Sequence, residues 1–171
     1  MKRGRKELTY EVLDNAQILV KKIVDSFPDL FWYIQPDKIM VLGIQNDPPK
    51  SKNWIARISP ISGVFKALAE KNKWLTKFVI ETYSMDWNEM SEKEKAWIMF
   101  HELLHVVAMK TTKMFKHDVL DFSCIVKKLG VNNYSNPDIT DLFGVKFDED
   151  FVNQRRDYIQ KQLEKIEGKQ S

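Results

Sequence analysis

The chain has 171 residues, of which 43% are hydrophobic, so it can bury a sizeable core and is not intrinsically disordered. Its net charge of +3 is modest and its basic residues are spread along the chain, so nucleic-acid binding has only weak support. No run of about 18 apolar residues is present and no long apolar stretch follows the basic start, so we expect neither a membrane span nor a signal peptide. The single cysteine, Cys124, can form no disulfide within the chain, and we expect a cytoplasmic protein.

The first half of the chain contains one predicted helix followed by predicted strands. Apolar residues recur every three or four positions across residues 8–27, which predicts an amphipathic helix. Residues 38–44 have the pattern of a buried strand, and residues 31–34 form a shorter apolar run. Residues 54–58 fit a strand or the end of a helix, whereas residues 61–76 predict a loop with at most one helical turn.

A strand and then a helix are predicted in the centre of the chain. Residues 77–83 are rich in β-branched and aromatic residues, which favours a strand. This strand could be a free sheet edge able to pair with an extended peptide, or an interior member of the sheet. Ser91 and Glu94 have the spacing of a capping box. No glycine or proline follows up to residue 110, so we expect a helix from residue 92 to about residue 110.

The predicted helix carries the motif His-Glu-x-x-His at residues 101–105. Positions i and i+4 lie on one face of a helix, so His101 and His105 point the same way and can bind one metal ion. Glu102 lies beside them, where it can take a proton from a water molecule on that metal. A pair of structural core histidines is the alternative, but the chain has only three histidines. We therefore predict a metal site.

A catalytic zinc ion keeps three protein ligands and one water molecule, so a third ligand is required. His117 is the remaining histidine, and we expect it at the start of a second helix that folds back over the first. We predict His117 as the third ligand. Asp118 and Asp121 are the alternatives: Asp121 could bind the metal or orient a ligand histidine, while Asp118 suits a helix N-cap.

The last third of the chain is predicted to be helical. The second helix should end at Gly130, which suits the position after a helix C-terminus. Asn136 followed by Pro137 predicts the start of a short helix that ends near Gly144. Residues 149–167 predict a last amphipathic helix.

Together these elements predict an α+β fold in a single domain over residues 1–171. We expect its core to cover about residues 8–130 and residues 131–171 to form a helical C-terminal extension. The sequence shows no internal repeat and no clear domain boundary.

The histidine motif at residues 101–105, followed by His-Asp-x-x-x-Phe at residues 117–122, resembles a metallopeptidase family found in phages and other mobile elements. The resemblance also includes residues 55–63 and 78–81, and spans about residues 8–130. It implies a compact zincin-type fold, in which a small mixed sheet packs against an N-terminal helix and the active-site helix. It further implies a zinc ion, with residues 101, 105 and 117 as its histidine ligands.

The resemblance implies that Glu102 is the catalytic base, and that the substrate is a protein or peptide. We therefore expect a zinc-dependent metallopeptidase, with Tyr83 and Tyr134 as candidate donors to the oxyanion. One alternative is a regulatory zinc-binding module without catalysis. Another is a narrow-specificity protease of a mobile element that acts on a repressor-like or DNA-bound protein.

Overall fold

The computed structural model describes residues 8–49, 54–71, 73, 75–109, 111–117, 122–130, 134, 136 and 138–168. Four strands form one sheet in the order β1-β2-β4-β3. Their bounds are Tyr10–Val12 for β1, Ile39–Ile44 for β2, Ala56–Pro60 for β3 and Phe78–Tyr83 for β4. The two central strands, β2 and β4, are parallel, while β1 and β3 are antiparallel to their neighbours. The sheet is therefore mixed, and the predicted α+β fold is confirmed.

The two central strands are almost continuously apolar because they are covered on both faces. In β2 only Met40 is not fully buried, and in β4 only Glu81. Such runs are typical of parallel strands inside a sheet. The strand predicted over residues 77–83 is confirmed, but the suggestion that it is a free edge is wrong. The edges are β1 and β3, and the ambiguous stretch at residues 54–58 contributes to β3.

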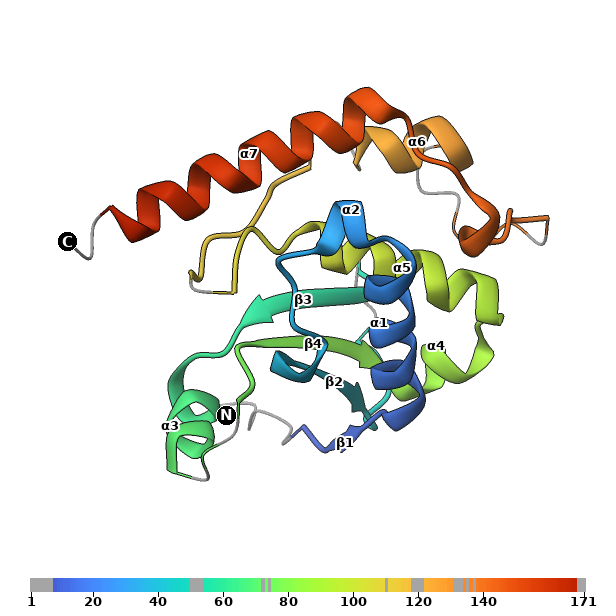
Figure 1. Cartoon of the computed structure of the whole chain (residues 1–171). Helices are drawn as coiled ribbons and strands as arrows, with labels where there is room; N and C mark the ends of the chain where they lie inside the picture. Colours follow the sequence, from blue (N-terminus) through green and yellow to red (C-terminus); the bar gives the residue numbers. More distant parts are fainter. Residues whose placement is uncertain are drawn as a thin grey trace.

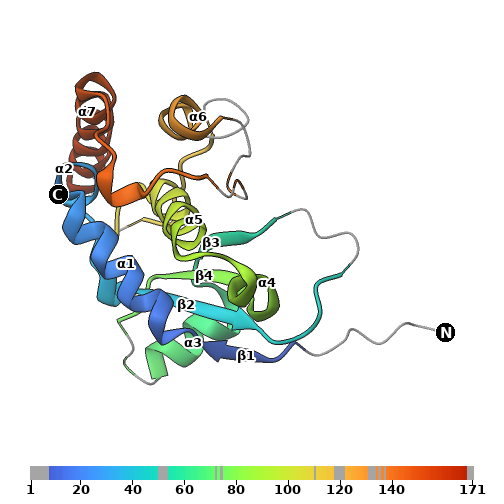
Figure 2. The same cartoon turned by 90° about the vertical axis from the view of Figure 1, so that its right-hand side faces the viewer.

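The N-terminal helix is shorter than its apolar pattern predicted. Helix α1 covers Asp14–Ser26, whereas the residues before it form β1 and pair with β2. Backbone pairing with a neighbouring strand has overridden the helical periodicity there, which local propensity alone cannot anticipate. Helix α1 packs against both β2 and the later helix α5, and Figure 2 shows it alongside the sheet.

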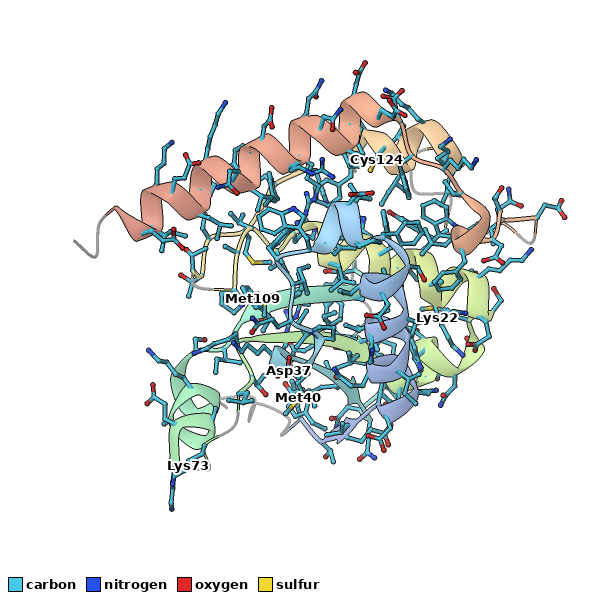
Figure 3. The ribbon with its side chains drawn as sticks, in the orientation of Figure 1. Lys22, Asp37, Met40, Lys73, Met109 and Cys124 are labelled. Atoms are coloured by element: carbon cyan, nitrogen blue, oxygen red, sulfur yellow. The ribbon has the colours of Figure 1, made fainter. Side chains whose placement is uncertain are left out.

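The predicted loop at residues 61–76 is largely a helix, so that prediction is wrong. Helix α3 covers Gly63–Lys71, and Gly63 begins it with a positive φ of 52°. The glycine that suggested a loop therefore marks a helix start, and the residues after it are mostly good helix formers. Lys73, just beyond the helix, points away from the rest of the molecule (Figure 3).

The helix that carries the histidine motif is α5, Glu92–Leu104. Its capping box is confirmed: the Glu94 amide donates to Ser91 Oγ at 3.3 Å and the Ser91 amide donates to Glu94 Oε2 at 2.7 Å. The helix ends six residues earlier than predicted because the chain turns at His105, and Val106 then forms a β-bridge with Met114. Met109, labelled in Figure 3, lies in the loop between these two residues.

The helix after the motif, α6, covers Ser123–Leu129, so the prediction that this helix starts at residue 117 is wrong. Gly130 follows it with a φ of 85°, as expected for the residue after a helix end. The next predicted helix is reduced to the 3₁₀ turn η2, Leu142–Gly144, whose N-cap is Asp141. The side chain of Asn136 accepts a hydrogen bond from the amide of Asp138 in a separate turn, and Pro137 lies outside the described residues.

The last helix, α7, covers Glu149–Glu167, as the sequence predicted. It crosses over α2, a short helix at Pro28–Phe31 that takes the place of the apolar run predicted near residue 31 (Figure 1). Two further short elements are η1, Pro36–Lys38, and α4, Ser84–Glu89. Among the described residues, no helix is both long and apolar enough to cross a lipid bilayer.

Aromatic side chains join α5 to the helices around it. Phe100 of α5 stacks on Phe147 with ring centroids 4.9 Å apart and makes edge contacts with Phe27 and Phe31. Lys22 of α1, labelled in Figure 3, places its Nζ 3.9 Å from the ring centroid of Phe143. In Figure 2, α5 lies above β3, and α6 and α7 lie beyond α5. The histidine helix is therefore held between the sheet edge and the C-terminal helices.

Candidate metal centre

The three histidines of the chain meet at one point. The Nε2 atoms of His101 and His105 are 3.2 Å apart, and the Nε2 atom of His117 lies 3.1 Å from each of them. The first two residues come from the end of α5, and the third follows in the extended segment after it. Three imidazole nitrogens arranged as a small triangle are a donor set for one metal ion.

A hairpin-like turn, rather than a second helix, brings His117 to this position. After His105 the chain reverses through the bridge between Val106 and Met114. The amide of Phe115 then donates to the carbonyl oxygen of His105 at 2.7 Å. These backbone bonds return the chain to the end of α5 within a few residues. His117 therefore lies beside the other two histidines, as predicted. The prediction that the start of a second helix brings it there is wrong.

The hydrogen bond on the far side of His105 defines which ring nitrogen faces the triangle. His105 Nδ1 lies 2.8 Å from the carbonyl oxygen of Phe115. A carbonyl can only accept, so Nδ1 carries the proton and the Nε2 of the neutral ring keeps a lone pair. That lone pair points toward the other two histidines, which is the arrangement a metal ligand needs.

Tyr134 performs the corresponding role for the first histidine. Its hydroxyl oxygen lies 2.7 Å from His101 Nδ1, and its side chain is buried. When the hydroxyl oxygen accepts from Nδ1, the Nε2 atom of His101 also presents a lone pair. Tyr134 lines the cavity at the histidines, whereas the other candidate oxyanion donor, Tyr83, is buried beside Trp54 with ring centroids 5.2 Å apart.

Phe122 packs against all three imidazole rings. Its ring centroid lies 5.4 Å from that of His101, 4.9 Å from that of His105 and 5.2 Å from that of His117. The side chain is 6% exposed. An apolar ring at this position excludes water and restricts the rotation of the imidazoles. Asp118 and Asp121, the alternative ligands, lie outside the described residues.

Glu102 is buried and lines the same cavity as the three histidines. Its Oε2 atom accepts a hydrogen bond of 2.7 Å from the backbone amide of Ile58 in β3. An edge strand has backbone groups that no neighbouring strand uses, and here one of them holds the carboxylate. The sheet edge therefore fixes the orientation of the acidic side chain of the motif.

The cavity has a volume of about 460 Å³. Its apolar lining includes Trp54, Ile58, Ile98 and Met114. Arg57 places its guanidinium carbon 4.6 Å from the ring centroid of Trp54. Apolar and aromatic side chains therefore form part of the cavity wall beside the histidines.

The distances between the three nitrogens fit a divalent metal ion. Tetrahedral zinc with Zn–N bonds of about 2.0–2.1 Å holds neighbouring ligand nitrogens about 3.3–3.4 Å apart. The observed separations of 3.1–3.2 Å are close to that value. Neutral imidazoles with outward-facing Nδ1–H groups are also the form in which histidine binds metals. The structure thus brings all four predicted site residues, His101, Glu102, His105 and His117, to one cavity.

Four supports of this site were not identified from the sequence. The carbonyl of Phe115 and the amide of Ile58 are backbone groups, which leave no signal in the residue type. Tyr134 was considered only as an oxyanion donor, and its contact with His101 spans 33 positions of sequence. Phe122 was present in the motif at residues 117–122, although no role had been assigned to it.

Comparison with known proteins identifies the family. The family described as "Putative phage metallopeptidase" matches residues 9–146, which extends beyond the span of about 8–130 expected from the sequence. No curated protein and no solved structure matches the chain. A metallopeptidase acts on a protein or peptide with the help of a metal ion, in agreement with the histidine cluster. The chain therefore belongs to the putative phage metallopeptidase family.

Proposed function

We propose that the chain is a zinc-dependent peptidase in which His101, His105 and His117 bind the metal and Glu102 is the general base. The observation that carries this proposal is the triangle of three Nε2 atoms in a cavity that a buried carboxylate also lines. A buried carboxylate is costly to desolvate, and a purely structural metal site has no use for it. The regulatory module without catalysis is therefore less well supported.

The position of each side chain suggests its role in the reaction. A zinc ion held by the three histidines would polarise the scissile carbonyl and lower the pKa of the attacking water. Glu102 takes the proton from that water and passes it to the nitrogen of the departing amine, so that the peptide bond is replaced by a carboxylate and an amine. The amide of Ile58 keeps the carboxylate in one orientation throughout. Tyr134 and Phe115 hold the imidazoles of His101 and His105 through their Nδ1 atoms.

The outer edge of β3, with which no other strand of the described residues pairs, supports a peptide as the substrate. The amide of Ile58 faces Glu102, so this side of β3 points away from β4. The N–H and C=O of one strand residue point to the same side, and the direction alternates along the strand. Ala56, two positions earlier, therefore presents both of its backbone groups at the cavity. An extended peptide can pair with these groups by strand addition.

The lining of the cavity favours an apolar residue near the bond that is cut. Trp54, Ile98 and Met114 surround the space next to the histidines, and Ile98 is itself buried in α5. An apolar side chain that enters this space loses its contact with water, which is worth about 25 cal/mol for each Å² buried. We therefore expect unfolded or extended segments with an apolar residue to be the preferred substrates.

The direct test compares the wild-type protein with Glu102→Gln. Zinc content is measured first, and a library of peptides cut from a whole proteome is then searched for new termini by mass spectrometry. We expect one zinc ion per chain in both proteins and new termini with the wild type alone, because glutamine cannot accept the proton. Cleavage by the variant at a rate close to that of the wild type, or failure of the zinc-loaded wild type to cut any peptide in the library, would contradict the proposal.

Membership of a phage family agrees with the alternative of a narrow-specificity protease that acts on a repressor-like or DNA-bound protein. This alternative uses the same site and differs only in the breadth of the substrates. The peptide library also tests it, because a narrow enzyme would yield a few termini that share one sequence. Cytoplasmic localisation, the single-domain organisation and nucleic-acid binding stay predictions.

A further inference from the structure

We propose that Arg155 of α7 is a positioning residue for the metal centre, and that α7 is therefore part of the working site. This inference rests on the function proposed above, because it assigns Arg155 a role in holding a metal ligand. Helix α7 begins at Glu149, beyond the residues 9–146 that match the family. The support that it gives is therefore a property of this chain outside the matched region.

The guanidinium of Arg155 lies against the end of the histidine helix. The side chain is 7% exposed, and one of its terminal nitrogens donates to the carbonyl oxygen of Leu104 at 2.9 Å. The same nitrogen lies 3.4 Å from the carbonyl oxygen of Val106. Leu104 and Val106 are the residues immediately before and after His105. Arg155 thus holds the main chain on both sides of one predicted ligand.

The charge of Arg155 also suits this position. The last carbonyl groups of a helix have no partners within the helix and carry a partial negative charge. A cation at the C-terminal end of α5 satisfies these groups and stabilises the last turn. His101 and His105 lie in and just after that turn, so a firm helix end fixes the spacing of their rings.

Arg155 also contacts a residue that orients the imidazole ring of His105. The guanidinium carbon lies 4.7 Å from the ring centroid of Phe115. The carbonyl of Phe115 accepts the hydrogen bond from His105 Nδ1 at 2.8 Å, and its amide donates to the His105 carbonyl at 2.7 Å. Arg155 therefore touches both the backbone of the ligand and the residue that sets the orientation of its ring.

Tyr33 completes the arrangement between Arg155 and α5. Its hydroxyl donates to the carbonyl oxygen of Val106 at 2.8 Å and accepts from Arg155 at 2.6 Å. Burial raises the pKa of Tyr33, although the nearby guanidinium works in the opposite direction. The hydroxyl thus stays neutral at physiological pH and can both donate and accept.

Stability alone does not account for an arginine at this position. Its Nε atom is buried and has no hydrogen-bond partner in the described part of the chain. A buried charge with an unsatisfied donor is costly, so its removal offsets part of the stability lost with its hydrogen bonds, and Tyr33 still donates to the carbonyl oxygen of Val106. Arg155→Met should therefore leave the protein folded while it removes the hold on the backbone around His105.

The neighbouring residue provides a matched control. Arg156, also on α7, forms an exposed ion pair of 2.6 Å with Asp29 at the start of α2. Like Arg155→Met, Arg156→Met removes one positive charge from α7 and loosens its attachment to the rest of the protein. Among the described residues, the hydrogen bond and ion pair of Arg156 go to Asp29 and not to a residue that holds His105. Any effect of general loosening of α7 should therefore appear in both variants.

The experiment measures zinc affinity of the full chain by competition with a chromogenic chelator, together with the visible spectrum of the cobalt-substituted protein. Residues that support metal ligands indirectly typically contribute about 10–100-fold in affinity, and we expect about tenfold weaker binding for Arg155→Met. The cobalt spectrum should change because the ligand geometry changes. Arg155→Lys keeps the positive charge but lacks the planar guanidinium, so its zinc affinity should lie between those of the wild type and Arg155→Met. The zinc affinity and cobalt spectrum of Arg156→Met should match those of the wild type.

Wild-type zinc affinity and an unchanged cobalt spectrum in folded Arg155→Met would overturn the inference, and so would an equal loss in Arg156→Met. Should Arg155→Met fail to fold by circular dichroism, Arg155→Lys and Tyr33→Phe decide the question. Wild-type affinity in both would then overturn the inference. Failure of the wild-type protein to bind zinc at all would instead contradict the proposed function, so the two failures can be told apart.

Discussion

The ligand segment, residues 101–117, and the outer supports, which are β3, Tyr134 and α7, contribute to the site in different ways. The ligand segment contains all four residues that would act on the metal or the water, and it folds on itself through short-range bonds. The outer supports contribute an amide, a hydroxyl and a guanidinium from distant parts of the chain. The comparison indicates that local sequence determines which atoms meet, and that remote elements determine how precisely they are held.

The largest expected effect is at the base within the ligand segment. Glu102→Gln should lower turnover by about 10²–10⁴-fold, the usual contribution of a general base, and leave zinc binding intact. Turnover of the zinc-loaded proteins on a peptide identified from the library is the measurement. Loss of zinc in this variant would mean that the carboxylate serves as a ligand, and the assigned division of roles would be wrong.

The next effect is at the third ligand. His117→Ala should weaken zinc binding by more than about 100-fold, since removal of a direct ligand costs more than removal of its supporting partner. Competition with a chelator gives the affinity. Asp121→Ala is the matched comparison, because Asp121 is the alternative ligand named from the sequence. A larger loss of zinc affinity in Asp121→Ala than in His117→Ala would indicate that the carboxylate of Asp121 is the third ligand.

An outer support of a ligand should have a smaller effect. Tyr134→Phe removes the hydroxyl beside His101 Nδ1 and keeps the ring, so we expect about 10-fold weaker zinc binding. Tyr83→Phe removes a hydroxyl from a tyrosine that does not line the cavity and serves as the control. If both variants bind zinc equally well, the hydroxyl of Tyr134 does not orient the imidazole.

The edge strand should have an effect of similar size, but on turnover rather than on zinc binding. Ile58→Pro removes the amide that holds Glu102, whereas Ile58→Ala keeps that amide and shortens only the side chain. We expect turnover to fall by about tenfold more in the proline variant, because a base without its support is oriented less well. Zinc affinity should be equal in the two. A difference in zinc affinity would show that β3 supports the ligands rather than the base.

Sequence reasoning was most reliable where a feature depends on neighbouring residues. The capping box of Ser91 and Glu94, the bounds of α7 and the shared face of His101 and His105 all follow from short-range patterns. The apolar periodicity of residues 8–27 predicted too long a helix, because residues 10–12 instead pair with the distant strand β2.

Features that depend on long-range contacts could not be predicted in the same way. Helix α5 was predicted to continue past His105, yet a backbone pairing with the later loop ends it there. Which strand forms the edge beside Glu102 depends on the order of the strands in the sheet, which residue type does not reveal. The contacts of Arg155 could not be predicted for the same reason, because those with Leu104 and Tyr33 span 51 and 122 positions of sequence.

The most direct test of the central claim is X-ray absorption spectroscopy at the zinc edge of the metal-loaded protein. Three imidazole nitrogens and one oxygen at about 2.0–2.1 Å are expected around the zinc, and His117→Ala should lose one of the three imidazoles. A zinc ion with two imidazoles in the wild-type protein, or an unchanged spectrum in His117→Ala, would contradict the convergence of the three histidines on one metal.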